Sequence, residues 1–251
     1  MGKVSGWILC TALVLAGCQR ETAVPWQSAI LSTEALDNLA LPTFLVDVAT
    51  AARYRQEGLA FRQQGDMERA IATLKIAAAL DPRNPEGQVL LGWTQHLAGF
   101  AAPAVSALQT ALSYSPEHVP ALNALGIVYL VDGQLEAAVE THTRAAELEP
   151  RNEIAHYNLS LAYQRLGQVE QAVAEAQTAT ELEPGNPHPW VALALAHWSA
   201  ENNAEAIANY RQALAIDSRY TSRDYLDHLE QAGFSQEQIE ATEEIRQAAG
   251  L

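Results

Sequence analysis

Cysteine is almost missing from this chain, whose 251 residues include only 2, Cys10 and Cys18. A disulfide framework therefore cannot be the main source of its stability. Basic side chains are also scarce, because 15 Lys and Arg stand against 30 Asp and Glu, for a formal net charge of −15. Nucleic acids bind clustered cations, so this composition argues against a nucleic-acid partner and favours a neutral or basic one, although acidity also simply keeps a protein surface soluble.

Catalytic sequence signatures are missing as well. The chain contains no GxSxG, HExxH, CxxC, GxGxxG or Walker-type GxxxxGK[ST] sequence. None of its 7 histidines has a second histidine four residues away, and His142 and His156, which fall on successive predicted helices, have no carboxylate or thiol placed with them. We therefore predict no catalytic residue, no metal site and no cofactor, and we expect the histidines to pack or to form hydrogen bonds.

Apolar runs long enough to span a bilayer are absent too. The apolar run at the N-terminus has the length of an export signal. Lys3 precedes an apolar stretch, residues 4–15, that is too short to span a bilayer but fits the core of a signal peptide. The stretch ends in Leu15-Ala16-Gly17-Cys18, which resembles the lipobox of bacterial lipoproteins. In that family the chain is cut before the cysteine, and the cysteine carries the lipid.

This resemblance implies three segments: a lipoprotein signal peptide at residues 1–17, a lipid anchor on Cys18 and a polar tether at residues 18–25. It places the protein in the bacterial cell envelope. Gln19 after the cysteine, rather than Asp, favours the periplasmic face of the outer membrane if the cell has one. An ordinary signal peptide and an uncleaved anchor are the alternatives.

Internal repetition dominates the rest of the chain. Each period contains two runs of helical periodicity, the first broken at a glycine and the second ended by a proline. The period is 34 residues, seen in Gly65, Gly99, Gly133 and Gly167 and in Pro82, Pro116, Pro150 and Pro184. Two alanine columns keep the same step through a fifth copy: Ala70, Ala104, Ala138, Ala172, Ala206 and Ala77, Ala111, Ala145, Ala179, Ala213. Neither helix of such a unit could bury its apolar stripe alone, so we predict a stack of hairpins.

The period, the glycine and alanine columns and the terminal prolines together resemble the tetratricopeptide repeat (TPR) family. The resemblance implies an all-α fold, a right-handed α-solenoid of about five TPR helix hairpins with an N-terminal helix and a C-terminal helical cap. The predicted segments are an N-terminal helical segment at 26–50, five units at 51–84, 85–118, 119–152, 153–186 and 187–218, and capping helices at 219–251.

Local signals mark the ends of several helices. Asn84, Asn152 and Asn186 are predicted N-caps, because a short polar side chain can accept a hydrogen bond from the first turn. The fifth unit turns at Glu201-Asn202-Asn203 instead of at a glycine. Near the C-terminus, Ser235 and Gln238 form a capping-box pattern. One further helix, capped by Thr221 or Ser222 and carrying Tyr225, Leu226 and Leu229, is expected just before it.

Three columns of residues flank the core stripe of the first helix of each unit. By resemblance to TPR proteins, this flank lines a concave groove that receives peptides or helices. The columns are Leu59, Trp93, Ile127, Leu161, Leu195; Arg55, Val89, Asn123, Tyr157, Val191; and Arg62, His96, Leu130, Gln164, Trp198. Aromatic side chains among aliphatic ones suit an apolar or amphipathic protein segment. The alternative for the leucine-rich column is that it only completes the packing between helices.

The sequence therefore predicts a non-enzymatic, lipid-anchored envelope scaffold or adaptor. Its groove would hold a segment of another protein and so support assembly of an envelope complex. The alternative is a small-ligand or metal-binding delivery lipoprotein, which would require polar side chains to converge in the groove. The sequence leaves the partner, the envelope process and the oligomeric state open.

Overall fold

A computed structural model describes residues 46–251 of the chain, and residues 47–251 form one compact unit. The predicted signal peptide, Cys18, the tether and most of the predicted N-terminal helical segment lie outside the described residues. Within the described part there is no strand, and no helix is long and apolar enough to cross a bilayer.

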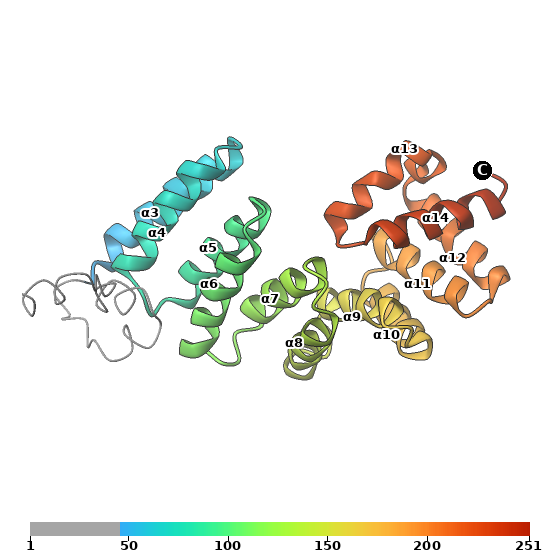
Figure 1. The fold of residues 1–251 in the computed structure, drawn as a ribbon, viewed down its shortest axis with the longest axis horizontal. Helices are drawn as coiled ribbons and strands as arrows, with labels where there is room; N and C mark the ends of the chain where they lie inside the picture. Colours follow the sequence, from blue (N-terminus) through green and yellow to red (C-terminus); the bar gives the residue numbers. More distant parts are fainter. Residues whose placement is uncertain (1–45) are drawn as a thin grey trace, which may run out of the picture. The chain divides into compact units, whose positions relative to one another are not determined.

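Residues 47–251 begin with five consecutive helical hairpins (Figure 1). The paired helices are α3 (Val48–Gln63) with α4 (Met67–Leu80), α5 (Pro85–Leu97) with α6 (Ala101–Tyr114), α7 (Val119–Val131) with α8 (Leu135–Leu148), α9 (Glu153–Arg165) with α10 (Val169–Leu182), and α11 (Pro187–Ser199) with α12 (Asn203–Ile216). The opening helix α3 starts inside the segment predicted as N-terminal and is the longest of the ten, with 16 residues. The α-solenoid predicted from the repeat is confirmed.

The turn inside each hairpin uses a left-handed backbone conformation. Four of the five turns place glycine there, with φ between +71° and +81° at Gly65, Gly99, Gly133 and Gly167. The fifth turn has Glu201 in the same conformation, with φ +58°. A residue with a Cβ is strained in this region by roughly 1–2 kcal/mol, so the fifth hairpin carries a strain that the other four avoid.

Asparagine caps begin three of the first helices, as predicted. The side-chain oxygens of Asn84, Asn152 and Asn186 accept hydrogen bonds from the backbone N–H groups of Gly87, Ala155 and His188 at 3.0, 3.1 and 3.0 Å. Each bond satisfies a donor that the helix itself cannot pair.

Small residues let the two helices of a hairpin approach closely. The two alanine columns are buried in all five units. In the first two hairpins a glycine on the first helix faces a leucine on the second: a Cβ added to Gly58 or Gly92 would lie 2.7 Å from Cγ of Leu74 or Leu108. The third hairpin keeps the glycine, Gly126, but places His142 opposite it.

His142 is fully buried, and neither of its ring nitrogens has a hydrogen-bond partner. Burial lowers the pKa of His142 to about 3, because a charged imidazole would lose its hydration there. The ring is therefore a neutral packing element at neutral pH, and it carries an unpaired polar group inside the third hairpin.

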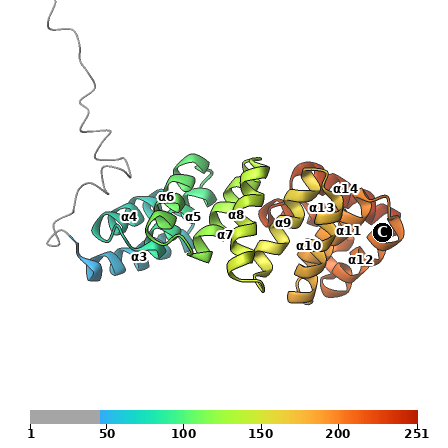
Figure 2. The same ribbon diagram turned by 90° about the horizontal axis from the view of Figure 1, so that it is seen from below.

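The five hairpins follow one another along the array (Figure 2). Consecutive first helices, α3, α5, α7, α9 and α11, contact one another, so they share one side of the stack. The second helices α4, α6, α8 and α10 each pack between their own first helix and the first helix of the next unit, whereas α12 packs against α11 and the C-terminal segment. The three predicted columns all belong to first helices and therefore lie on this shared side.

The chain after the fifth hairpin is less regular than expected. A short helix, η2 (Ser218–Thr221), comes first, and the helix predicted after Thr221 or Ser222 begins at the N-cap Ser222 but is divided into α13 (Arg223–Leu226) and η3 (Asp227–Ala232), which ends at Gly233 with φ +88°. The capping box is confirmed: the Gln238 N–H donates to Ser235 Oγ at 3.3 Å and the Ser235 N–H donates to Gln238 Oε1 at 2.9 Å. The last helix, α14 (Gln236–Ala248), then packs on α11 and α12.

Candidate partner-binding groove

The C-terminal segment returns to the side of the stack formed by the first helices. We name residues 227–234 the C-terminal insert; they comprise η3, Gly233 and Phe234. The hydroxyl of Tyr157 on α9 donates to the carbonyl oxygen of Ala232 at 2.6 Å, and the Tyr157 ring lies 6.1 Å from that of Phe234. The insert is thus held directly on predicted groove residues.

Hydrogen bonds from α14 extend this attachment. The amide nitrogen of Gln238 donates to the Leu161 carbonyl at 3.3 Å and to Gln164 Oε1 at 2.8 Å. The indole N–H of Trp198 donates to Glu244 Oε2 at 3.3 Å. The polar atoms of Tyr157, Gln164 and Trp198 are therefore already used within the chain.

Four of the predicted groove positions are core residues. Leu130, Leu161, Val191 and Leu195 are at most 1% exposed. They belong to one hydrophobic cluster with C-terminal residues, among them Leu226, Leu229, Phe234 and Ile239. The sequence columns place these positions on the correct side of the stack, but the chain's own C-terminal segment covers them. They offer no free surface to a partner.

A cavity of about 940 Å³ lies where the groove is not covered. One side of it is apolar and comes from α5 and α7: Trp93, Leu97, Ile127 and Val131, which we name the apolar strip. Trp93 and Ile127 are half-buried, whereas Leu97 and Val131 are 48% and 53% exposed. His96 lines the same side, its ring 5.1 Å from that of Trp93, and burial lowers its pKa.

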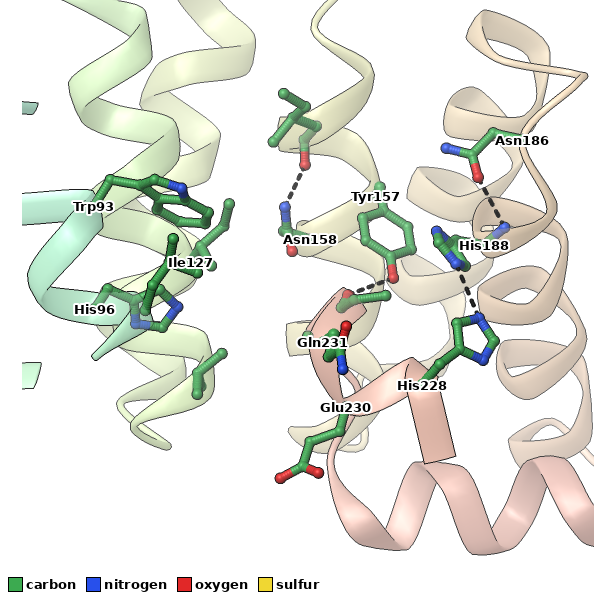
Figure 3. Close-up of a pocket in the computed structure, with 15 residues that line it drawn as sticks. Trp93, His96, Ile127, Tyr157, Asn158, Asn186, His188, His228, Glu230 and Gln231 are labelled. Carbon is green, nitrogen blue, oxygen red and sulfur yellow. Dashed lines mark hydrogen bonds between the residues drawn. The ribbon is translucent and has the colours of Figure 1, made fainter. Parts of the chain in front are cut away.

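The insert and the later helices form the opposite, more polar side of the cavity. Figure 3 shows Trp93, His96 and Ile127 on one side of the cavity and this polar side opposite them. The labelled residues on the polar side are Tyr157, Asn158, Asn186, His188, His228, Glu230 and Gln231. The site is therefore composite, with one wall from α5 and α7 and the other from α9, the start of α11 and the non-repeating C-terminal insert.

The remaining predicted groove residues do not line this cavity. Arg55 forms an ion pair with Asp81 at 3.3 Å, and Arg62 donates to Thr94 Oγ1 at 3.4 Å. Asn123 exchanges two side-chain hydrogen bonds with Asn152, at 3.3 and 3.2 Å. Leu59 and Val89 are half-buried. Of the 15 predicted positions, the structure brings Trp93, His96, Ile127 and Tyr157 together around the cavity.

Sequence reasoning missed several residues that line the cavity. Leu97 and Val131 are one repeat period apart and directly follow His96 and Leu130, so extending the columns by one residue would have found them. The insert residues His228, Glu230 and Gln231 lie outside the repeat, and no periodic signal could have placed them there. His142 packs in the core, as expected of the histidines, but the expectation that no carboxylate lies with His156 was wrong, because its Nδ1 pairs with Glu175 on α10 at 2.6 Å.

The chain matches one tetratricopeptide repeat family at residues 55–99 and 157–220 and a second TPR family at residues 131–167, which together make up more than half of its length. No significant match to a curated protein was found.

Solved structures share the fold over most of their own length. A crystal structure of MamA is 25% identical with a TM-score of 0.58, over 64% of this chain and 95% of MamA. TTC0263, a thermophilic TPR protein of Thermus thermophilus, is 26% identical with a TM-score of 0.56, over 67% and 92%. MamA from Desulfovibrio magneticus RS-1 is 23% identical with a TM-score of 0.62, over 69% of this chain and 98% of MamA, and this likeness supports the fold only.

TPR repeats generally serve protein–protein interaction and are non-catalytic. The chain belongs to the tetratricopeptide repeat family.

Proposed function

We propose that this protein is a lipid-anchored scaffold of the bacterial envelope that binds an amphipathic helix of another protein in the composite cavity. The observation that carries the proposal is the apolar strip. Trp93 and Leu97 are four residues apart on α5, as are Ile127 and Val131 on α7, so their side chains form adjacent ridges along the cavity. Such a surface accepts the i, i+3, i+4 anchors of a helix laid along it.

The exposure of the strip favours a chain segment over a small molecule. A small ligand is usually enclosed by its pocket, whereas Leu97 and Val131 are about half exposed and Ile154 beside them is 40% exposed. A half-buried tryptophan at the centre of the strip is typical of an interface anchor. Exposed apolar side chains gathered on one side of a monomer mark an interaction surface.

The charge of the chain indicates the polar face of the partner. The net charge is −15, and the insert presents Glu230, an exposed carboxylate, to the cavity. Like charges across an interface disfavour binding, so the partner helix should carry neutral or basic residues beside its apolar face. The C-terminal insert would limit how far such a helix extends toward α11.

Anchoring rests on the N-terminal sequence. A lipid on Cys18 would hold the scaffold at the membrane and restrict its search for a membrane-associated partner to the same surface. Stable anchoring requires more than one acyl chain, at about 0.8 kcal/mol per buried methylene. Replacing Cys18 by Ala should move the protein from the membrane fraction to the soluble fraction, and unchanged membrane association would contradict the anchor.

The groove assignment can be tested by photo-crosslinking in living cells. A photoreactive amino acid at Leu97 or Val131 should trap a discrete protein, and the Ile127→Asp substitution should abolish the adduct because it places a charge in the apolar strip. Ile76 on α4 is a matched control, since it is 46% exposed and does not line the cavity. Equal trapping from Ile76, or adducts that survive Ile127→Asp, would contradict the assignment.

A further inference from the structure

Two histidines that the proposed function does not use face each other at the polar side of the cavity. His188 lies in the first turn of α11 and His228 lies in the C-terminal insert, 40 residues later. Their Nε2 atoms are 3.4 Å apart, and both rings line the cavity (Figure 3). The pair joins the fifth repeat to the insert.

The separation of the two nitrogens matches a metal site. Zinc holds imidazole nitrogens at 2.0–2.1 Å in a tetrahedral arrangement, which places two ligand nitrogens about 3.4 Å from each other. We propose that His188 Nε2 and His228 Nε2 together bind a divalent transition-metal ion of the Zn²⁺, Ni²⁺ or Cu²⁺ class. This site is independent of whether a helix binds the apolar strip.

The hydrogen bond at Nδ1 of His228 leaves the ring's lone pair on Nε2, the nitrogen that faces His188. Its Nδ1 faces the carbonyl oxygen of Tyr225, an atom that can only accept, so Nδ1 carries the proton and a neutral ring has its lone pair on Nε2. Histidine ligands of metals commonly donate their other N–H to a carbonyl in this way, which fixes the ring and its tautomer.

His188 Nε2 faces His228 Nε2, which holds its lone pair there, so His188 Nε2 carries the proton of the hydrogen bond between the two rings. Metal binding requires a lone pair on this nitrogen, so this proton leaves or moves to Nδ1 when the ion binds. The cavity provides a route of entry for the ion and room for water at the other coordination positions.

The site is an open one. Within the described residues, no group of three or more His, Cys, Asp or Glu side chains is placed to hold a metal. Water or a bound ligand must complete the coordination, so binding should be exchangeable rather than structural. Among these ions, Cu²⁺ should bind most tightly.

Tyr220 can distinguish metal binding by the two histidines from a purely structural role. Its hydroxyl lies 3.2 Å from His228 Nε2 and competes with a metal for the same lone pair. Removing this hydroxyl in Tyr220→Phe should free the nitrogen and tighten metal binding. A purely structural role for the histidines gives no reason for Tyr220→Phe to strengthen an interaction with metal.

The test is calorimetric titration of the purified full chain with Ni²⁺ or Zn²⁺ at neutral pH. The variants are His188→Asn and His228→Asn, because the amide of Asn keeps a donor near the place of Nδ1 while removing Nε2. Losing even a hydrogen-bond partner of a metal ligand weakens binding roughly 10- to 100-fold, so losing one ligand should weaken binding by at least about tenfold. Tyr220→Phe should bind more tightly than wild type.

His96→Asn is the matched control, since His96 lines the same cavity without a second imidazole at ligating distance. It should leave the affinity unchanged. The metal should also raise the thermal midpoint of the wild type by joining α11 to the insert, and the shift should disappear in His188→Asn. Wild-type affinity in both histidine variants, or an equal loss in His96→Asn, would overturn the site.

Discussion

The two ends of the groove are built from equivalent positions, yet they differ in what covers them. On the leucine-rich column, Trp93 and Ile127 are half-buried beside an open cavity, whereas Leu161 and Leu195 are each 1% exposed. All four occupy the same place in their repeats. The difference arises from the non-repeating C-terminal segment, which covers the last two units, reaches Leu130 in the third and leaves Trp93 and Ile127 beside the open cavity.

The hydrophobic cores show the same contrast. Toward the N-terminal end the clusters are small and separate, each joining parts of neighbouring hairpins. The fourth and fifth units share one large cluster with Leu130 and Ala138 of the third unit and with the C-terminal segment, including its buried Tyr220, Phe234 and Ile245. A repeat array is stabilised by contacts between neighbours alone, so the added segment should make the C-terminal end the more stable part.

Replacing Phe234 by Ala should have the largest effect. Phe234 is 3% exposed and packs in the C-terminal cluster, so its loss leaves a cavity beneath the insert. The expected destabilisation is about 3–5 kcal/mol in urea unfolding. Phe100, which is 55% exposed, is the control, and Phe100→Ala should change the free energy of unfolding by less than about 0.5 kcal/mol. Equal effects of the two substitutions would show that the insert does not pack as described.

His142 lies in the third hairpin, between the two ends of the groove, and its replacement by Leu should stabilise that hairpin. Leucine there would reproduce the Gly58–Leu74 and Gly92–Leu108 packing and remove an unpaired buried imidazole. His142→Leu should raise the free energy of unfolding by about 1–3 kcal/mol at pH 7. Urea unfolding of both proteins provides the measurement, and a less stable variant would contradict the comparison of the hairpins.

The difference in stability between the wild type and His142→Leu should depend on pH. The pKa of His142 is about 3 in the folded chain and 6.5 in the reference state, so the unfolded chain binds the proton more readily. The wild type should therefore lose stability relative to His142→Leu as the pH falls below 6.5, by up to about 1.4 kcal/mol per pH unit until pH 3 is approached. A difference that stays constant between pH 7 and pH 4.5 would show that His142 is not kept neutral.

The polar attachment of the insert should contribute less than its apolar packing. Tyr157→Phe removes the hydroxyl that donates to the Ala232 carbonyl, with an expected loss of about 1–2 kcal/mol in the same unfolding measurement. Tyr129→Phe is the control, because the Tyr129 hydroxyl accepts a hydrogen bond from the Gln109 amide at an exposed position. It should change stability by less than about 0.5 kcal/mol. A smaller effect for Tyr157→Phe than for Tyr129→Phe would contradict this attachment.

The repeat sequence was sufficient to predict the hairpins, their asparagine caps and the side on which the groove lies. Each of these depends on residues close in sequence or on the period itself. The accessible part of the groove could not be predicted, because it depends on contacts between Tyr157 and Ala232, 75 residues apart, and between His188 and His228. These contacts occur once and leave no periodic trace.

Replacing Glu201 by Gly should have the smallest effect on the free energy of unfolding. It tests the strain of the fifth turn alone, apart from the packing of the C-terminal segment. It adopts φ +58°, where the other four hairpins have glycine. Glycine removes the strain of a Cβ, roughly 1–2 kcal/mol, but makes the unfolded chain more flexible, so Glu201→Gly should stabilise by a net amount of about 0.5–1 kcal/mol. Gly133→Ala, which introduces the strain into the third hairpin, should destabilise the protein. If Glu201→Gly is instead destabilising, the last hairpin does not share the turn of its neighbours, and its stability comes from the C-terminal segment alone.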